Sequence, residues 1–144
     1  MSLLGVEHND EVHAKAARAI GELARDHAPN QSAIAAASGI PPLVALLEEA
    51  STADEAKEEA ASALWSLAAK HKDNQSTIAT ARGIPPLVTL IGTGDEHAQA
   101  QAAGALTAIG LNHPTNQEAI SEMLKQLLSA GLANKHVVSP SIAK

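Results

Sequence analysis

The chain has 144 residues, no cysteine, phenylalanine or tyrosine, and a formal net charge of -6 from ten basic and sixteen acidic side chains. Without cysteine it can form neither a disulfide framework nor a thiolate zinc site. A negative chain with a single tryptophan also lacks the cationic stripe and the stacking platforms of nucleic-acid binders, so we expect no nucleic-acid partner.

The N-terminal segment, residues 1–8, has no basic region and is too short for the apolar part of a signal peptide. We interpret it as a separate segment of the kind that an expression vector adds. Two longer stretches without charged residues, 27–47 and 98–117, approach the length of a membrane span but contain asparagine and glutamine, which are costly in hydrocarbon. We therefore expect no membrane span and a cytoplasmic location.

The first long helix is predicted to begin after Asn9, where Asp10 and Glu11 favour the positive end of the helix dipole. Apolar residues then recur at helical spacing, so that one face is suited to burial; they are Ala16, Ala19, Ile20 and Leu23. A helix of roughly 17 residues would be about 25 Å long. The histidine that follows, His27, is expected to end this helix, and His71 and His113 are expected to end two later ones.

Two short helices are predicted next. Asn30 is a good residue to start the first of them, and Gly39 is expected to end it in the left-handed conformation. Pro41-Pro42 prevents continuation and pre-sets the first turn of the second short helix, which carries Leu43, Val44, Leu46 and Leu47. No segment is predicted to be a strand.

The chain then repeats itself. With an offset of 44, residues 15–46 match residues 59–90 at 19 of 32 positions. With an offset of 42, the pattern of alanine, leucine, histidine and Asn-Gln recurs again in residues 102–120. The later long helices are expected around Thr52 and Thr93, which have capping-box spacing to Glu55 and Glu96. Because one such unit cannot bury its apolar face alone, the sequence predicts stacked helical units, a solenoid.

The last predicted element is a closing helix, residues 118–130, with apolar residues at helical spacing up to Leu128. Lys125 and Gln126 stand where the glycine and isoleucine of the repeat would continue the array. Gly131 is expected to end this helix, and residues 132–144 are expected to form a loose tail.

The sequence resembles the armadillo repeat family. The resemblance is carried by Asn74-Gln75, by Gly39-Ile40-Pro41-Pro42-Leu43-Val44 and its copy 44 residues later, and by the alanine-leucine blocks of the long helices. It implies an all-α fold, a right-handed superhelix of about three repeats with the first and last incomplete. The repeat domain is predicted to cover residues 9–131, with units at about 9–37, 38–81 and 82–124.

In the family, the long helices line a concave groove that binds extended peptide segments of other proteins. The resemblance therefore implies a noncatalytic interaction module with a protein or peptide partner and with no cofactor or metal. The groove residues expected by alignment are Lys15, Arg18, Glu22, Glu59, Ser62, Ser66, Gln101, Gly104 and Ala108. Glu22, Ser66 and Ala108 replace the family's usual asparagine, so binding of nuclear-localisation signals of the importin kind is not expected.

Two alternatives to a binding module stay open from the sequence. The chain can be a structural or self-associating spacer, with homo-oligomers formed through the incomplete first repeat, or a regulatory fragment of a larger protein. The acidic run from Glu48 to Glu59 is interpreted as a solvated loop and helix start rather than a site. Trp65 is expected to fill space between units, with a role as an anchor for a partner as the alternative.

Overall fold

The computed structural model describes residues 2–143, with the side chains of residues 9–131. This part of the chain is all helical, with no strand, which confirms the predicted fold class. The helices in chain order are α1 (Ser2–Ala24), α2 (Ala28–Ala36), α3 (Ile40–Glu48), α4 (Asp54–Ala68), α5 (Lys72–Thr80), α6 (Ile84–Thr93), α7 (Glu96–Gly110) and α8 (Pro114–Ala143). Within the described residues, no helix is both long enough and apolar enough to cross a membrane.

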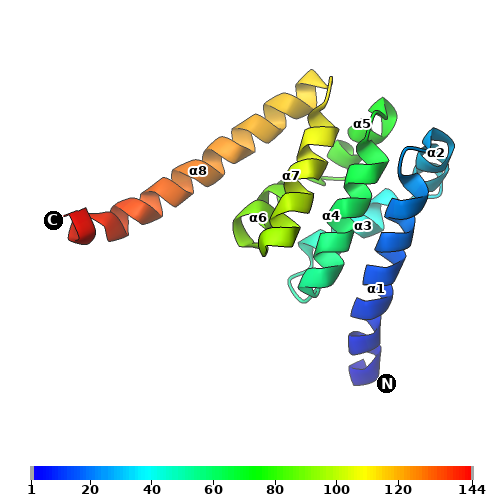
Figure 1. The fold of residues 1–144 in the computed structure, drawn as a ribbon, viewed down its shortest axis with the longest axis horizontal. Helices are drawn as coiled ribbons and strands as arrows, with labels where there is room; N and C mark the ends of the chain where they lie inside the picture. The colour runs from blue at the N-terminus through cyan, green and yellow to red at the C-terminus, as the bar shows by residue number, and fades with distance from the viewer. Residues whose placement is uncertain (1, 144) are drawn as a thin grey trace.

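The long helices α1, α4 and α7 lie side by side and form one layer (Figure 1). The short helices α3 and α6 form a second layer, in which α3 packs on α4 and α6, and α6 packs on α7 and α8. Each of these short helices therefore lies against the long helix of its own unit and against an element of the next unit. This arrangement is the predicted α-solenoid.

The core between the layers consists of small and aliphatic side chains. On α4, seven positions are completely buried: Ala56, Ala60, Ala61, Ala63, Leu64, Leu67 and Ala68. A Cβ atom at Gly21 of α1 would lie 3.2 Å from the Cα of Ala63, so α1 and α4 approach each other closely. Small residues at this contact allow the long helices to pack backbone to backbone.

Buried asparagine side chains connect neighbouring units. The Nδ2 of Asn74 donates to the carbonyl of Leu67 at 2.9 Å, within its unit, and to the carbonyl of Gln31 at 3.1 Å, in the preceding unit. One unit later, the Nδ2 of Asn116 donates in the same way to the carbonyls of Ile109 and Gln75, both at 3.1 Å. The carbonyls of Leu67 and Ile109 lie in the last turns of α4 and α7, where helices leave acceptors without a partner.

The neighbouring glutamines act across the same boundary. The Nε2 of Gln31 donates to the carbonyls of Ser66 and Ala69, near the end of α4. The Nε2 of Gln75 donates to the carbonyls of Ala68 and Ala108, and so bridges α4 and α7. We call these asparagine and glutamine contacts the Asn-Gln staples. Among the described side chains, no buried nitrogen or oxygen lacks a hydrogen-bond partner.

The prediction that the histidines end the long helices is wrong. His27 and His71 are instead the N-caps of α2 and α5, and their Nδ1 atoms accept hydrogen bonds of 3.1 Å from the N–H groups of Asn30 and Asn74. His113 accepts the corresponding bond from Asn116 at 3.3 Å. The asparagines therefore lie inside the first turn rather than at the start of the helix.

The predicted role of the two repeat glycines is also wrong. Gly39 and Gly83 have φ values of -78° and -77°, whereas the residues before them, Ser38 and Arg82, have the positive φ values of 61° and 64°. Glycine is needed because a Cβ atom would lie 2.7 Å from the Cγ2 of Ile34 in one copy and of Ile78 in the other. The chain turns without left-handed glycine.

Several helix boundaries differ from the predictions. Thr52 and Thr93 are not caps, because α4 begins at Asp54 and α6 includes Thr93, while Asp95 caps α7 through a 2.9 Å bond from the N–H of Ala98. The backbone of residues 2–8 belongs to α1 rather than to a separate segment. Gly131 does not end α8, since a single glycine inside a helix costs only about 1 kcal/mol and no proline pair follows it.

Candidate functional site

The candidate site is the surface formed by α1, α4 and α7, which we call the long-helix face. Two neighbouring hollows lie on it. The first, the tryptophan hollow, has a volume of about 380 Å³ and is lined by Arg25, Asp26, Ser62, Trp65, Ser66, Ala69 and Gln101. The second, the ion-pair hollow, has a volume of about 230 Å³ and is lined by Arg18, Gly21, Glu22, Arg25, Glu59 and Ser62. Arg25 and Ser62 belong to both hollows, so the two are continuous.

Six of the nine groove residues expected from the sequence line these hollows: Arg18, Glu22, Glu59, Ser62, Ser66 and Gln101. The other three do not. Lys15 is 76% exposed and pairs with Glu11 on its own helix at 3.0 Å. Gly104 lies beneath the ring of Trp65. Ala108 is only 7% exposed and belongs to the core, so its side chain is not available to a partner.

An ion pair spans the boundary between α1 and α4. The Nε and a terminal nitrogen of Arg18 both donate to the Oε2 of Glu59, the former at 2.7 Å. These hydrogen bonds and the charge of Glu59 raise the pKa of Arg18 further above its usual value. Because the two groups satisfy each other, this part of the face presents a closed pair rather than two free charges. Exposed pairs of this kind contribute little to stability.

Trp65 is the residue at the centre of the tryptophan hollow. A Cβ atom at Gly104 would lie 2.4 Å from its ring, so the indole of α4 packs directly against the glycine of α7. The ring crosses the boundary between two units, as expected for a filler, yet the residue remains 42% exposed. The sequence signal for this contact was Gly104, which leaves room for the ring of Trp65. The equivalent positions in the other units, Arg18 and Ser62, carry side chains.

Sequence reasoning also missed Arg25, Asp26 and Ala69. They follow the aligned positions by one turn or less, at the ends of α1 and α4, where the units differ in sequence. Among the described residues Arg25 makes no ion pair, and its guanidinium is therefore free to bind an acceptor beside the indole of Trp65.

The comparison with protein families decides what these units are. The family described as Armadillo/beta-catenin-like repeat matches residues 27–69 and 71–109, which together make up more than half of the chain. The chain belongs to the armadillo repeat family.

The two armadillo matches correspond to two successive sets of three helices, α2 to α4 and α5 to α7, so each begins one helix earlier than the predicted units 38–81 and 82–124, which we keep as the units of the array. Each match begins at a capping histidine, His27 or His71, and ends with a long helix. Armadillo arrays are generally noncatalytic scaffolds, and such an array fits a protein-interaction module. In the described part of the chain, no group of three or more histidine, aspartate or glutamate side chains could hold a metal ion.

A solved structure is also similar to this armadillo chain. It is the crystal structure of an engineered protein from the Northeast Structural Genomics Consortium, with a TM-score of 0.74 and 34% sequence identity. The match covers 79% of this chain and 45% of the engineered protein, so the chain spans less than half of that protein's length. The comparison with curated proteins gave no match.

Proposed function

We propose that this protein is a noncatalytic binding module whose long-helix face holds an extended segment of a partner protein. The observation that carries the proposal is the exposure of Trp65 inside a hollow with a polar rim. Tryptophan is enriched among the residues that dominate binding energy, because its large ring gains much from burial while its N–H can still bond. A ring that is 42% exposed in the free protein has contact area left to bury.

The rim of the tryptophan hollow indicates the chemistry of the partner. Ser62, Ser66 and Gln101 offer short hydrogen-bonding side chains to the backbone of an extended segment. Arg25 offers a planar guanidinium suited to a carboxylate. We therefore expect a segment that places an apolar side chain on Trp65 and an acidic side chain next to Arg25. No asparagine stands at the family's asparagine positions, and of the residues that replace it only Ser66 lines this hollow.

The experiment begins with peptides selected from a random displayed library on the intact protein. The affinity of a selected peptide is then measured by the fluorescence of Trp65, the only tryptophan, and by calorimetry for variants that lack it. We expect Trp65→Ala to weaken binding at least tenfold, about 1.4 kcal/mol. Arg25→Ala should weaken the binding of acidic peptides selectively.

Lys15→Ala is the matched control, because Lys15 lies on α1 but outside both hollows. Its variant should bind as the unmodified protein does. If no selected peptide depends on Trp65 or Arg25, the proposal is wrong and the alternative of a structural spacer is favoured. Circular dichroism of each variant confirms that the helices are retained.

A further inference from the structure

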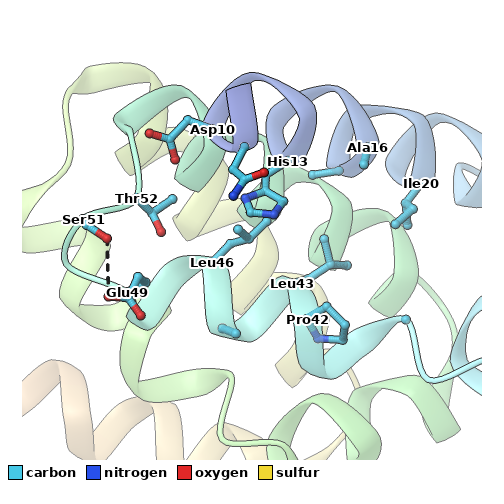
Figure 2. Close-up of a pocket in the computed structure, with 14 residues that line it drawn as sticks. Asp10, His13, Ala16, Ile20, Pro42, Leu43, Leu46, Glu49, Ser51 and Thr52 are labelled. Carbon is cyan, nitrogen blue, oxygen red and sulfur yellow. Dashed lines mark hydrogen bonds between the residues drawn. The ribbon is translucent and has the colours of Figure 1, made fainter. Parts of the chain in front are cut away.

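A hollow larger than the two on the long-helix face lies away from that face, between α1 and α3 (Figure 2). Its volume is about 560 Å³. We call it the α1/α3 groove. Its walls are lined by Asn9, Asp10, His13, Ala16, Ala17 and Ile20 of α1, by Gly39, Pro42, Leu43, Ala45, Leu46 and Glu49 at α3, and by Ser51 and Thr52.

The repeat explains why this groove exists. The short helix α3 packs on the long helix α4 of its own unit and on α6 of the next unit, and α6 packs on α7 and α8 in the same way. By this rule, a short helix of the first unit would pack on α1 and on α3. The α1/α3 groove has the position of that helix. The chain's own residues 2–8 do not provide it, because their backbone continues α1.

Equivalent positions show that a cover is missing. Ala60 and Leu64 of α4 are completely buried, whereas the residues 44 positions earlier, Ala16 and Ile20 of α1, are exposed and half-buried respectively. On the opposite wall, Leu90 of α6 is buried, whereas Leu46 of α3 is only half-buried. The groove is thus an apolar surface of the kind that the other units bury under a short helix.

At the other end of the described chain, α8 follows α7 as α5 follows α4, but no second short helix comes after it. Lys125 to Leu128 occupy the positions of Gly83-Ile84-Pro85-Pro86, so nothing turns the chain and α8 continues as one helix. Leu127 still packs on α6, where a Cβ atom at Gly92 would lie 3.2 Å from it. The next residue, Leu128, is 67% exposed, and from there α8 extends away from the other helices (Figure 1).

The charges of the two ends are complementary. Asp10 and Glu49 line the groove, and Glu48 is exposed beside it. After Leu127, the chain carries two lysines, Lys135 and Lys144, and no acidic residue. A helix from the C-terminal end would therefore bring positive charge to an acidic groove.

We propose that the C-terminal part of α8 from a second copy of this chain occupies the α1/α3 groove and serves as the missing short helix. The second short helices of the complete units, α3 and α6, have 9 and 10 residues, and the part of α8 after Leu127 is longer than either. The contact joins different surfaces of the two copies. It closes into a reciprocal dimer or continues head to tail, according to the angle between the copies.

The test is the molar mass of the full chain, measured by light scattering during size-exclusion chromatography over a range of concentrations. We expect twice the chain mass of 14.7 kDa, or a higher multiple. Leu128→Glu adds a carboxylate to the helix that would enter a groove lined by Asp10 and Glu49, and should give a monomer. Ala45→Arg places a bulky cation in the groove and should also give a monomer. Both sites are exposed, so the fold should survive.

Thr89→Arg is the matched control, since Thr89 is the exposed equivalent of Ala45 on α6 and does not line the groove. It should associate as the unmodified chain does. Mixing the two monomeric variants should restore a 1:1 complex, because one partner keeps an intact groove and the other an intact α8. A monomeric unmodified chain at every concentration overturns the proposal and leaves the groove to a different occupant. Association that survives Leu128→Glu overturns it as well.

Discussion

At Gly83 the glycine is required by packing and not by backbone conformation. Its φ of -77° is open to any residue, but a Cβ atom would meet the Cγ2 of Ile78 at 2.7 Å and the Cγ2 of Val44 at 3.2 Å. Both atoms lie in the preceding unit, 38–81, that of Ile78 on α5 and that of Val44 on α3. The residue thus sets how closely two units stack as well as how the chain turns.

We predict that Gly83→Ala lowers the free energy of unfolding by about 1–3 kcal/mol, as expected for overpacking a filled site. The measurement is a urea unfolding curve followed by circular dichroism. Gly131→Ala is the control, because a Cβ atom there meets nothing within 4 Å and glycine inside a helix is unfavourable. It should leave stability unchanged or raise it. Equal losses in the two variants would contradict the packing explanation.

For single residues, the sequence could identify the important positions but not the roles of the side chains there. Glycine before a proline pair satisfies either a positive φ or a close approach, and only the structure shows that Ser38 and Arg82 take the positive φ. Histidine three residues before Asn30 suits the end of one helix as well as the start of the next. The position of Nδ1 on the N–H of Asn30 decides between them.

At the scale of helices, the Asn-Gln staples connect neighbouring units. Asn74 is almost completely buried and donates to one carbonyl in its own unit and one in the unit before. Asn30 is its equivalent in the first unit, where it donates to the carbonyl of Leu23 at 2.8 Å and has no earlier unit to reach. The same residue type therefore has different importance in the two places.

We predict that Asn74→Ala costs at least about 2 kcal/mol of stability, since two buried hydrogen bonds are lost and the carbonyl of Leu67 loses its donor. Asn30→Ala should cost about 0.5–1.5 kcal/mol, because it loses one hydrogen bond at a more exposed position. Urea unfolding of both variants under identical conditions makes the comparison. An equal cost would show that the bond from Asn74 to the preceding unit contributes nothing.

Element ends were harder to predict than the elements themselves. Each helix was identified from its spacing of apolar residues or from the Gly-Ile-Pro-Pro block. The start of α4 at Asp54 and of α7 at Glu96 depends instead on loops that differ between the units. The length of α8 was missed because Gly131 looked like a terminator, although the signal that does turn this chain is the proline pair.

Across the whole molecule, the array is a stack in which each unit touches only its neighbours. Its middle is covered on both sides, and its first unit is open at the α1/α3 groove. The stacked fold could be predicted from the repeat alone, because equal sequences in equal surroundings pack alike. The site was predicted only in part, since Trp65 and Arg25 depend on how α1, α4 and α7 lie against one another.

We predict that truncation is costlier in the middle of the stack than at its open end. Leu64→Ala should lower stability by about 2–5 kcal/mol, as for other completely buried leucines. Ile20→Ala, at the equivalent but half-buried position, should cost clearly less in dilute protein. Chemical unfolding at several protein concentrations provides the measurement. A cost for Ile20→Ala that equals that of Leu64→Ala in dilute protein would show that the first unit is not open.

The staples have a consequence for how such a chain can grow. Asn74 and Asn116 make the same two bonds at successive boundaries. Gln31 and Gln75 share one bond, to the carbonyls of the equivalent residues Ser66 and Ala108. A duplicated module inserted between two existing ones would meet matching carbonyl acceptors on one side and present them on the other. Lengthening by whole modules would therefore require no new kind of contact between units, and gene duplication alone could extend the array.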